Sequence, residues 1–262
     1  MPTPYDPIQA HELLASVIYG DPSATNRTSA YLAAPDWASF FAIDPVNTKL
    51  FVAKYKFETT FEECEPFILQ NLKAIVNYAH NGLKTRWEDG ETALIDAMMI
   101  ARDSEPYRLA LIYANSLVKP GRWIEFETQL NVGSQAARLN KNENGKVIEL
   151  INAYLAEVAD IKDPALEEIM FLNSNPNIVI DYLINKNQVG PVTSFEATLY
   201  NRFNNLNADA MRAAIVYTIR IRQTRWTELE AALERQRSLS DIMYYKANMI
   251  PSDVIIEDLL GL

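Results

Sequence analysis

The sequence predicts an all-α protein made of degenerate helix-pair repeats of about 35 residues, stacked as an α-solenoid of the HEAT or TPR type. Three observations predict this class: a phrase containing arginine-tryptophan recurs, apolar residues between its copies follow helical spacing, and glycine is scarce. The 8 glycines among 262 residues disfavour all-β folds, which need tight hairpins, and nucleotide-binding folds, which need glycine-rich phosphate loops. A chain of 262 residues is long for one compact core but suits a linear stack.

Residues 1–45 differ from the rest because prolines divide them into short pieces. We predict a helix over residues 8–19 and an irregular N-terminal cap over the remainder of this segment. The repeat array is expected to occupy residues 46–239, and residues 240–262 are expected to form a C-terminal capping helix and tail.

The repeated phrase is clearest in three segments, and three of the four tryptophans of the chain belong to it. In each copy a tyrosine lies nine or ten residues before the tryptophan, acids follow at two and four residues after it, and a leucine follows at seven. The tyrosine and tryptophan of the three copies are Tyr78 and Trp87, Tyr113 and Trp123, and Tyr217 and Trp226. We interpret these six residues as the structural positions of the repeat.

Weaker copies align with the same offsets. Phe61 takes the tryptophan position upstream and Val192 takes it downstream, so the successive spacings are 26, 36, 69 and 34 residues. Because 69 is close to two periods, we expect an eroded copy within 134–172. The polar segment 140–146 is predicted to be a loop and a hinge.

Helix starts are marked by proline and by capping residues. Proline in the first helical turn is predicted after Ser104, Asp163 and Asn175. The run from Thr85 to Glu88 fits a capping box, in which a hydroxyl and a carboxylate satisfy free N–H groups. Each unit therefore contains a helix, a short turn that ends in arginine-tryptophan, and a second helix.

The phrase resembles a helical repeat of uncharacterised bacteriophage proteins, which reads approximately Y-A-x-x-V-x-x-x-R-W-x-E-x-E. The match covers residues 74–94, 104–130 and 207–233. It departs at 134–200, where no arginine-tryptophan pair occurs, and at Tyr217-Thr218, where the alanine is replaced. The resemblance implies a viral or virus-derived origin but no biochemical activity, because such a repeat is a scaffold.

The tryptophans of the phrase have two interpretations. We interpret each as a wedge between the two helices of its unit, since their spacing follows the structural period; a ladder of rings that stacks a ligand is the alternative. The arginine before each tryptophan is expected to pair with an acid of its own or a neighbouring unit, and phosphate binding is the alternative.

The sequence predicts no catalytic residue, no metal and no cofactor, and we expect that the protein is not an enzyme. The paired acids after each tryptophan lie two residues apart and do not face each other on a helix, so we interpret them as acids that stabilise a helix start. Nitrogen and sulfur ligands for zinc are limited to His11, His80 and Cys64. No G-x-S-x-G, H-E-x-x-H or Walker-type motif occurs.

The net charge of −10 is concentrated at the ends of the chain. Residues 71–239 contain 21 acids and 19 bases, an almost even balance, which argues against non-specific binding to duplex nucleic acid. Residues 202–237 nevertheless contain seven arginines, no lysine and four acids. Within them we predict partner-binding residues at Arg212, Arg220, Arg222 and Arg225, because a guanidinium binds carboxylate or phosphate in a bidentate manner. A solvated, internally paired face is the alternative.

We therefore expect an interaction protein whose partner is another protein, of a host or of a virus. A structural virion or assembly component and a nucleic-acid binder acting through 202–237 are the alternatives. The single cysteine, the absence of a signal-peptide pattern and the absence of a long apolar run predict a cytoplasmic or virion protein without a membrane partner.

Overall fold

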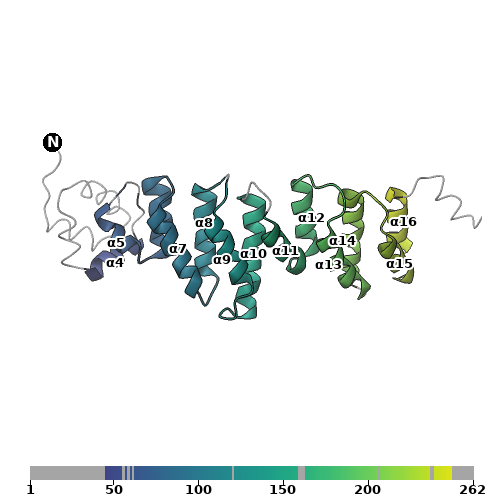
Figure 1. The fold of residues 1–262 in the computed structure, drawn as a ribbon, viewed down its shortest axis with the longest axis horizontal. Coiled ribbons are helices and arrows are strands. Elements are labelled where there is room, and N and C mark those ends of the chain that lie inside the picture. Colours follow the sequence, from purple (N-terminus) through teal and green to yellow (C-terminus); the bar gives the residue numbers. More distant parts are fainter. Residues whose placement is uncertain are drawn as a thin grey trace, which may run out of the picture. The chain divides into compact units, whose positions relative to one another are not determined.

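The computed structural model describes residues 45–249, except 55–56, 58–59, 61, 120, 159–162, 206 and 237–238 (Figure 1). Within these residues every regular element is a helix and no β-strand occurs, which confirms the all-α class. The helix predicted at 8–19, the rest of the cap as far as residue 44, and the tail after residue 249 lie outside the described residues.

The chain divides into two compact units, Met1–Ile161 and Lys162–Leu262. The helices of the first unit are α4 (Pro45–Lys54), the 3₁₀-helix η1 (Glu62–Cys64), α5 (Glu65–Ile68), α6 (Leu72–Asn77), the π-helix η2 (Tyr78–Leu83), α7 (Glu88–Ile100), α8 (Glu105–Leu117), α9 (Ile124–Ser134) and α10 (Lys141–Glu157). Contacts join α6 to α8, α7 to α9 and α8 to α10. Each of these helices therefore packs against the second helix after it.

The second unit follows the same order of contacts. Its helices are α11 (Pro164–Asn173), α12 (Pro176–Asn185), α13 (Thr193–Asn204), α14 (Ala208–Tyr217), the π-helix η3 (Thr218–Arg222), α15 (Thr227–Gln236) and α16 (Leu239–Met249). Here α11 contacts α13, α12 contacts α14, α13 contacts α15 and α14 contacts α16. Helices α12, α14 and α16 thus form one row, and α11, α13 and α15 form a second row.

Several helix starts agree with the sequence. Pro106 lies in the first turn of α8, and the side chains of Asp163 and Asn175 accept backbone N–H groups at the starts of α11 and α12. The capping box from Thr85 to Glu88 is wrong, because α7 begins after Trp87, whose backbone is extended and whose side chain makes no capping hydrogen bond.

The loop predicted at 140–146 is also wrong. Asn140 caps α10 through hydrogen bonds from the N–H groups of Asn142 and Glu143, each at 3.0 Å, and the helix continues to Glu157. The polar residues that suggested a loop form the N-cap and the first turns of this helix, where several side chains are exposed. The boundary between the compact units lies later, between Ile161 and Lys162.

Candidate functional site

The three tryptophans of the repeated phrase are buried, as the wedge interpretation requires. The exposed fractions are 9% for Trp87, 1% for Trp123 and 4% for Trp226. Each indole packs against the tyrosine of its own phrase, with ring centroids 5.2 Å apart for Tyr78 and Trp87, 5.2 Å for Tyr113 and Trp123, and 6.0 Å for Tyr217 and Trp226. A ligand-stacking ladder is not compatible with this burial.

The hydroxyl of Tyr113 connects its phrase to the preceding one. It accepts a hydrogen bond from the backbone N–H of Trp87 at 2.7 Å and donates one to the carboxylate of Glu91 at 2.9 Å. We call this set of backbone N–H, tyrosine hydroxyl and glutamate carboxylate a tyrosine joint. Because the ring packs on Trp123 while the hydroxyl bonds to the preceding phrase, one side chain links two successive phrases.

Three further tyrosine joints have the same connectivity. They consist of Trp123, Tyr154 and Glu127 (3.1 and 2.7 Å), of Val192, Tyr217 and Glu196 (2.7 and 2.8 Å), and of Trp226, Tyr245 and Glu230 (3.0 and 3.0 Å). The hydrogen bond from tyrosine to glutamate also occurs at 2.7 Å from Tyr78 to Glu65 and from Tyr182 to Glu167.

The local structure explains why a hydroxyl is needed here. Trp87 and Val192 at this position have an extended backbone. The carbonyl of Trp87 begins the following helix, because it accepts the N–H of Glu91 at 2.8 Å. The side chains of Trp87, Trp123 and Val192 provide no capping oxygen. Because the neighbouring tyrosine hydroxyl accepts the backbone N–H of this residue, a buried donor is satisfied.

An arginine pairs with the glutamate of each complete joint. Arg86 binds Glu91 through two hydrogen bonds of 2.7 Å, and Arg225 binds Glu230 at 2.9 and 2.7 Å. Arg122 binds Glu127, whose side chain is only 4% exposed, through its Nε and Nη2 groups. The prediction that these arginines pair with an acid of their own or a neighbouring unit is confirmed, and each pairs within its own phrase.

The electrostatics of the joints favour a structural role. Burial raises the pKa of Tyr245 to about 12 and also raises the pKa of Tyr113, Tyr154 and Tyr217. The hydrogen bond from Arg225 lowers the pKa of Glu230. At neutral pH the hydroxyl therefore donates and the carboxylate accepts. Catalysis by proton transfer near neutral pH needs a group whose pKa is close to the pH, and the tyrosines do not meet this condition.

The sequence did not predict Tyr154 and Tyr245 as joint tyrosines. Tyr182, which bonds to Glu167, lies ten residues before Val192, at the tyrosine position of that weaker copy. A signal for the eroded copy was present, because Tyr154 lies nine residues before Asp163, which lies four residues before Glu167. The clear phrases have the same spacings, with tyrosine nine or ten residues before the tryptophan and an acid four residues after it. Asp163 therefore stands at the tryptophan position of this copy.

The structure separates the four arginines predicted to bind a partner. Arg222 binds Glu196 at 2.8 Å and lies over the indole of Trp226, with 5.3 Å to the ring centroid, while Arg225 binds Glu230. Arg212 and Arg220 are exposed, and neither side chain has a hydrogen bond or ion pair with another described residue. Two of the four thus pair with glutamates, although the side chain of Arg225 remains 57% exposed, and the other two are exposed without such a pair among the described residues.

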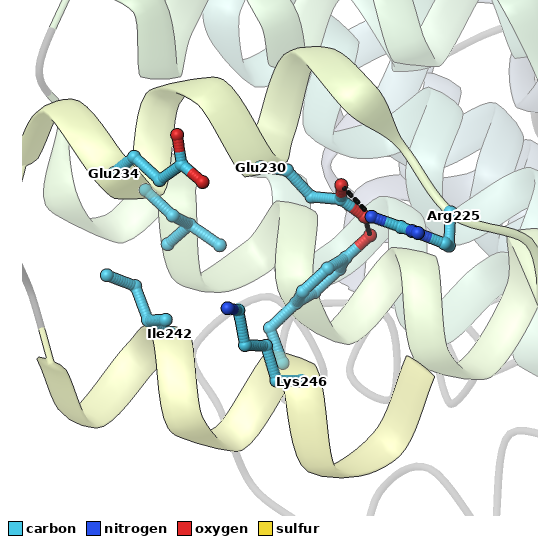
Figure 2. Close-up of a pocket in the computed structure, with 7 residues that line it drawn as sticks. Arg225, Glu230, Glu234, Ile242 and Lys246 are labelled. Carbon is cyan, nitrogen blue, oxygen red and sulfur yellow. Dashed lines mark hydrogen bonds and ion pairs between the residues drawn. The ribbon is translucent and has the colours of Figure 1, made fainter. Parts of the chain in front are cut away.

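A cavity of about 70 Å³ lies between α15 and α16 (Figure 2). Figure 2 shows Glu230 and Arg225 at one end, while Glu234 and Ile242 lie at the other end. Glu230 accepts hydrogen bonds from Arg225 and Tyr245. Pockets for small organic ligands are usually several times larger, so this space belongs to the last tyrosine joint rather than to a ligand site.

A wider hollow of about 360 Å³ lies at the starts of α12 and α14. Its polar groups serve the fold: Asn175 and Asn207 cap the two helices, and Arg202 donates to the carbonyl oxygens of Ser174 and Leu172 at 2.9 and 3.0 Å. These hydrogen bonds commit three of the polar lining residues to the fold.

No protein-family model, curated protein or solved structure matches this chain. Among the residues that the structure describes, no three histidine, cysteine, aspartate or glutamate side chains are grouped to hold a metal ion. No helix in this part of the chain is both long and apolar enough to cross a membrane.

Proposed function

We propose that the chain is a non-enzymatic helical-repeat protein, stacked as an α-solenoid within each compact unit, that binds another protein through the outer faces of its helices. Support for the stack comes from the order of helix contacts and from the recurring tyrosine joints. Stacked helix pairs present extended surfaces to which partners bind.

One observation favours protein binding in particular. The residue immediately before the joint tyrosine is apolar and solvent-exposed in three helices: Ile112 in α8 is 40% exposed, Val216 in α14 is 38% exposed and Tyr244 in α16 is 56% exposed. Isolated exposed apolar residues are common, but α14 and α16 contact each other, so Val216 and Tyr244 lie on adjacent helices. The same helices bury their joint tyrosines, so the exposed residues are free for a partner.

The nature of the partner follows from the sequence. Resemblance of the phrase to bacteriophage proteins supports a viral origin and a host or viral protein as the partner. The buried thiol of Cys64 fits a reducing cytoplasm. Nucleic-acid binding through 202–237 is less well supported, because Arg222 and Arg225 pair with glutamates.

The test is affinity capture from host and infected-cell lysates at physiological salt, after nuclease treatment. We expect a protein that is retained by the wild type and lost with Val216→Glu and Tyr244→Glu. The matched control is Leu172→Glu, an exposed apolar residue of α11 in the other row of helices, which should retain the partner. Retention that disappears with nuclease, or that all three variants share, would contradict this function.

A further inference from the structure

The outer surface of α14 and η3 contains three exposed side chains at intervals of four residues: Arg212, Val216 and Arg220. Residues four apart lie on one side of a helix, so these side chains form a row. We call it the arginine row. At 1.5 Å of rise per residue, its two guanidinium groups are separated by roughly 12 Å along the helix axis.

The charges of the arginine row are not neutralised within the described part of the chain. Arg212 and Arg220 have no carboxylate within ion-pair distance there, although Asp209 lies one turn before Arg212. Nearby Arg222 and Arg225, by contrast, each bind a glutamate. A chain with a net charge of −10 therefore exposes two uncompensated guanidinium groups on either side of an apolar side chain.

We propose that the arginine row binds an acidic segment of the partner protein, with one carboxylate on each arginine and an apolar side chain on Val216. The proposal rests on the proposed function and names the chemistry of its partner. Each guanidinium forms a bidentate pair with a carboxylate, and contact with Val216 removes apolar surface from water. A helical partner would provide the two acids seven or eight residues apart, and an extended one about four apart.

The surroundings of the row favour a protein over a nucleic acid. Ile178 on α12 and Tyr244 on α16 are exposed apolar side chains of two helices that contact α14 within the same row of helices. Asp181 and Asp209 are exposed there too, and they would repel a phosphate backbone. A peptide with two carboxylates brings less negative charge past these aspartates than a continuous phosphate backbone does.

The test is selection of a displayed library of random twelve-residue peptides on the full chain, with counter-selection on Arg212→Glu/Arg220→Glu. We expect the selected peptides to contain two acids at one of the spacings above with an apolar residue between them. A synthetic copy should bind the double variant roughly tenfold more weakly or worse. The control is Arg102→Glu/Lys141→Glu, which makes the same charge change in the first unit and should bind as the wild type does.

The outcomes separate this inference from the proposed function. Selected peptides that are no more acidic than the library, or that bind the double variant equally well, would overturn the arginine row as the site but leave protein binding in place. A library that yields no binder would overturn the arginine row as a site for an acidic segment, and the proposed function would then still be decided by affinity capture. Preferential binding of random-sequence single-stranded or duplex oligonucleotides through the row would show that its partner is a nucleic acid.

Discussion

The joint of Tyr154 in the first unit and the joint of Tyr217 in the second contain the same hydroxyl and carboxylate but differ in the residue that donates to the hydroxyl. The donor is the N–H of Trp123 in the first and of Val192 in the second. Because a backbone N–H is independent of the side chain, the hydrogen bond survives when the indole is lost. The constant feature of the repeat is thus the polar network, and the tryptophan is a variable part of its packing.

The two joints also obtain their arginine differently. In the first, Arg122 precedes the donor residue and binds Glu127. In the second, Pro191 occupies that position, and the guanidinium comes from Arg222, at the end of η3. The carboxylate is paired in both cases, because a buried charge without a partner is costly. The direction from which the guanidinium approaches is therefore free to change.

The largest expected difference between these joints concerns the ring. Trp123→Ala should lower the free energy of unfolding by about 3–5 kcal/mol, whereas Val192→Ala should lower it by about 1–2 kcal/mol, because fewer buried atoms are removed. Denaturant unfolding followed by circular dichroism measures both. Equal losses would mean that the indole contributes no more packing than valine does.

The second-largest effect on stability is expected from the arginine that pairs with the glutamate of the joint. Arg222→Leu should lower the free energy of unfolding by about 1–3 kcal/mol, because it leaves Glu196 without its guanidinium. Pro191→Arg should restore most of this loss in the Arg222→Leu background and change the wild type little. If Pro191→Arg restores none of the lost free energy of unfolding, the two arginine positions are not equivalent.

Unfolding at alkaline pH tests whether the protonated tyrosine hydroxyl is the feature that all the joints need. The pKa of Tyr245 is raised to about 12, so the folded state holds the phenolic proton more tightly than the unfolded state does. This contribution, on the order of 2–3 kcal/mol, is complete below about pH 10 and is lost as the pH rises through about 12.

The lowered pKa of Glu230 acts in the opposite direction, since its contribution is present above about pH 4.5 and is lost as the pH falls. Denaturant midpoints measured across pH should therefore decline on both sides of a plateau. Tyr245→Phe should reduce the alkaline decline. An unchanged decline in this variant would assign it to other groups.

The smallest effect concerns a turn that both units share. Lys84 and Gln223 follow the π-helices with φ values of 57° and 55°, the left-handed region that favours glycine. Gln223→Gly and Lys84→Gly should each raise the free energy of unfolding by up to about 1 kcal/mol, and thermal unfolding measures the change. A loss at either site would mean that the side chain stabilises the turn in a way that the backbone angle does not reveal.

Sequence alone predicted the parts of the fold that depend on local signals. Proline and capping residues located helix starts, and the regular recurrence of tryptophan predicted its burial. The segment 140–146 was misassigned because a polar composition describes an exposed helix start as well as a loop.

The partners of the joint could not be predicted in the same way. Tyr113 belongs by sequence to the phrase of Trp123 and Glu127, but its hydroxyl bonds to Trp87 and Glu91. The sequence spacing cannot reveal this, because the contact depends on how one helix pair packs on the previous one. For the same reason the neighbouring positions of Arg220, Arg222 and Arg225 did not predict which of them pairs with a glutamate.

The link that each tyrosine makes to the preceding phrase has a consequence for how such a chain changes in length. Every phrase with a complete joint presents the same amide and carboxylate on one side and a hydroxyl on the other. If one whole period were lost or duplicated, the amide and the carboxylate of one phrase would therefore again meet the hydroxyl of the next phrase, without further substitutions. Deletion or insertion of part of a period would leave a buried amide and a carboxylate without their hydrogen-bond partners. We therefore expect such a chain to change in length by whole periods.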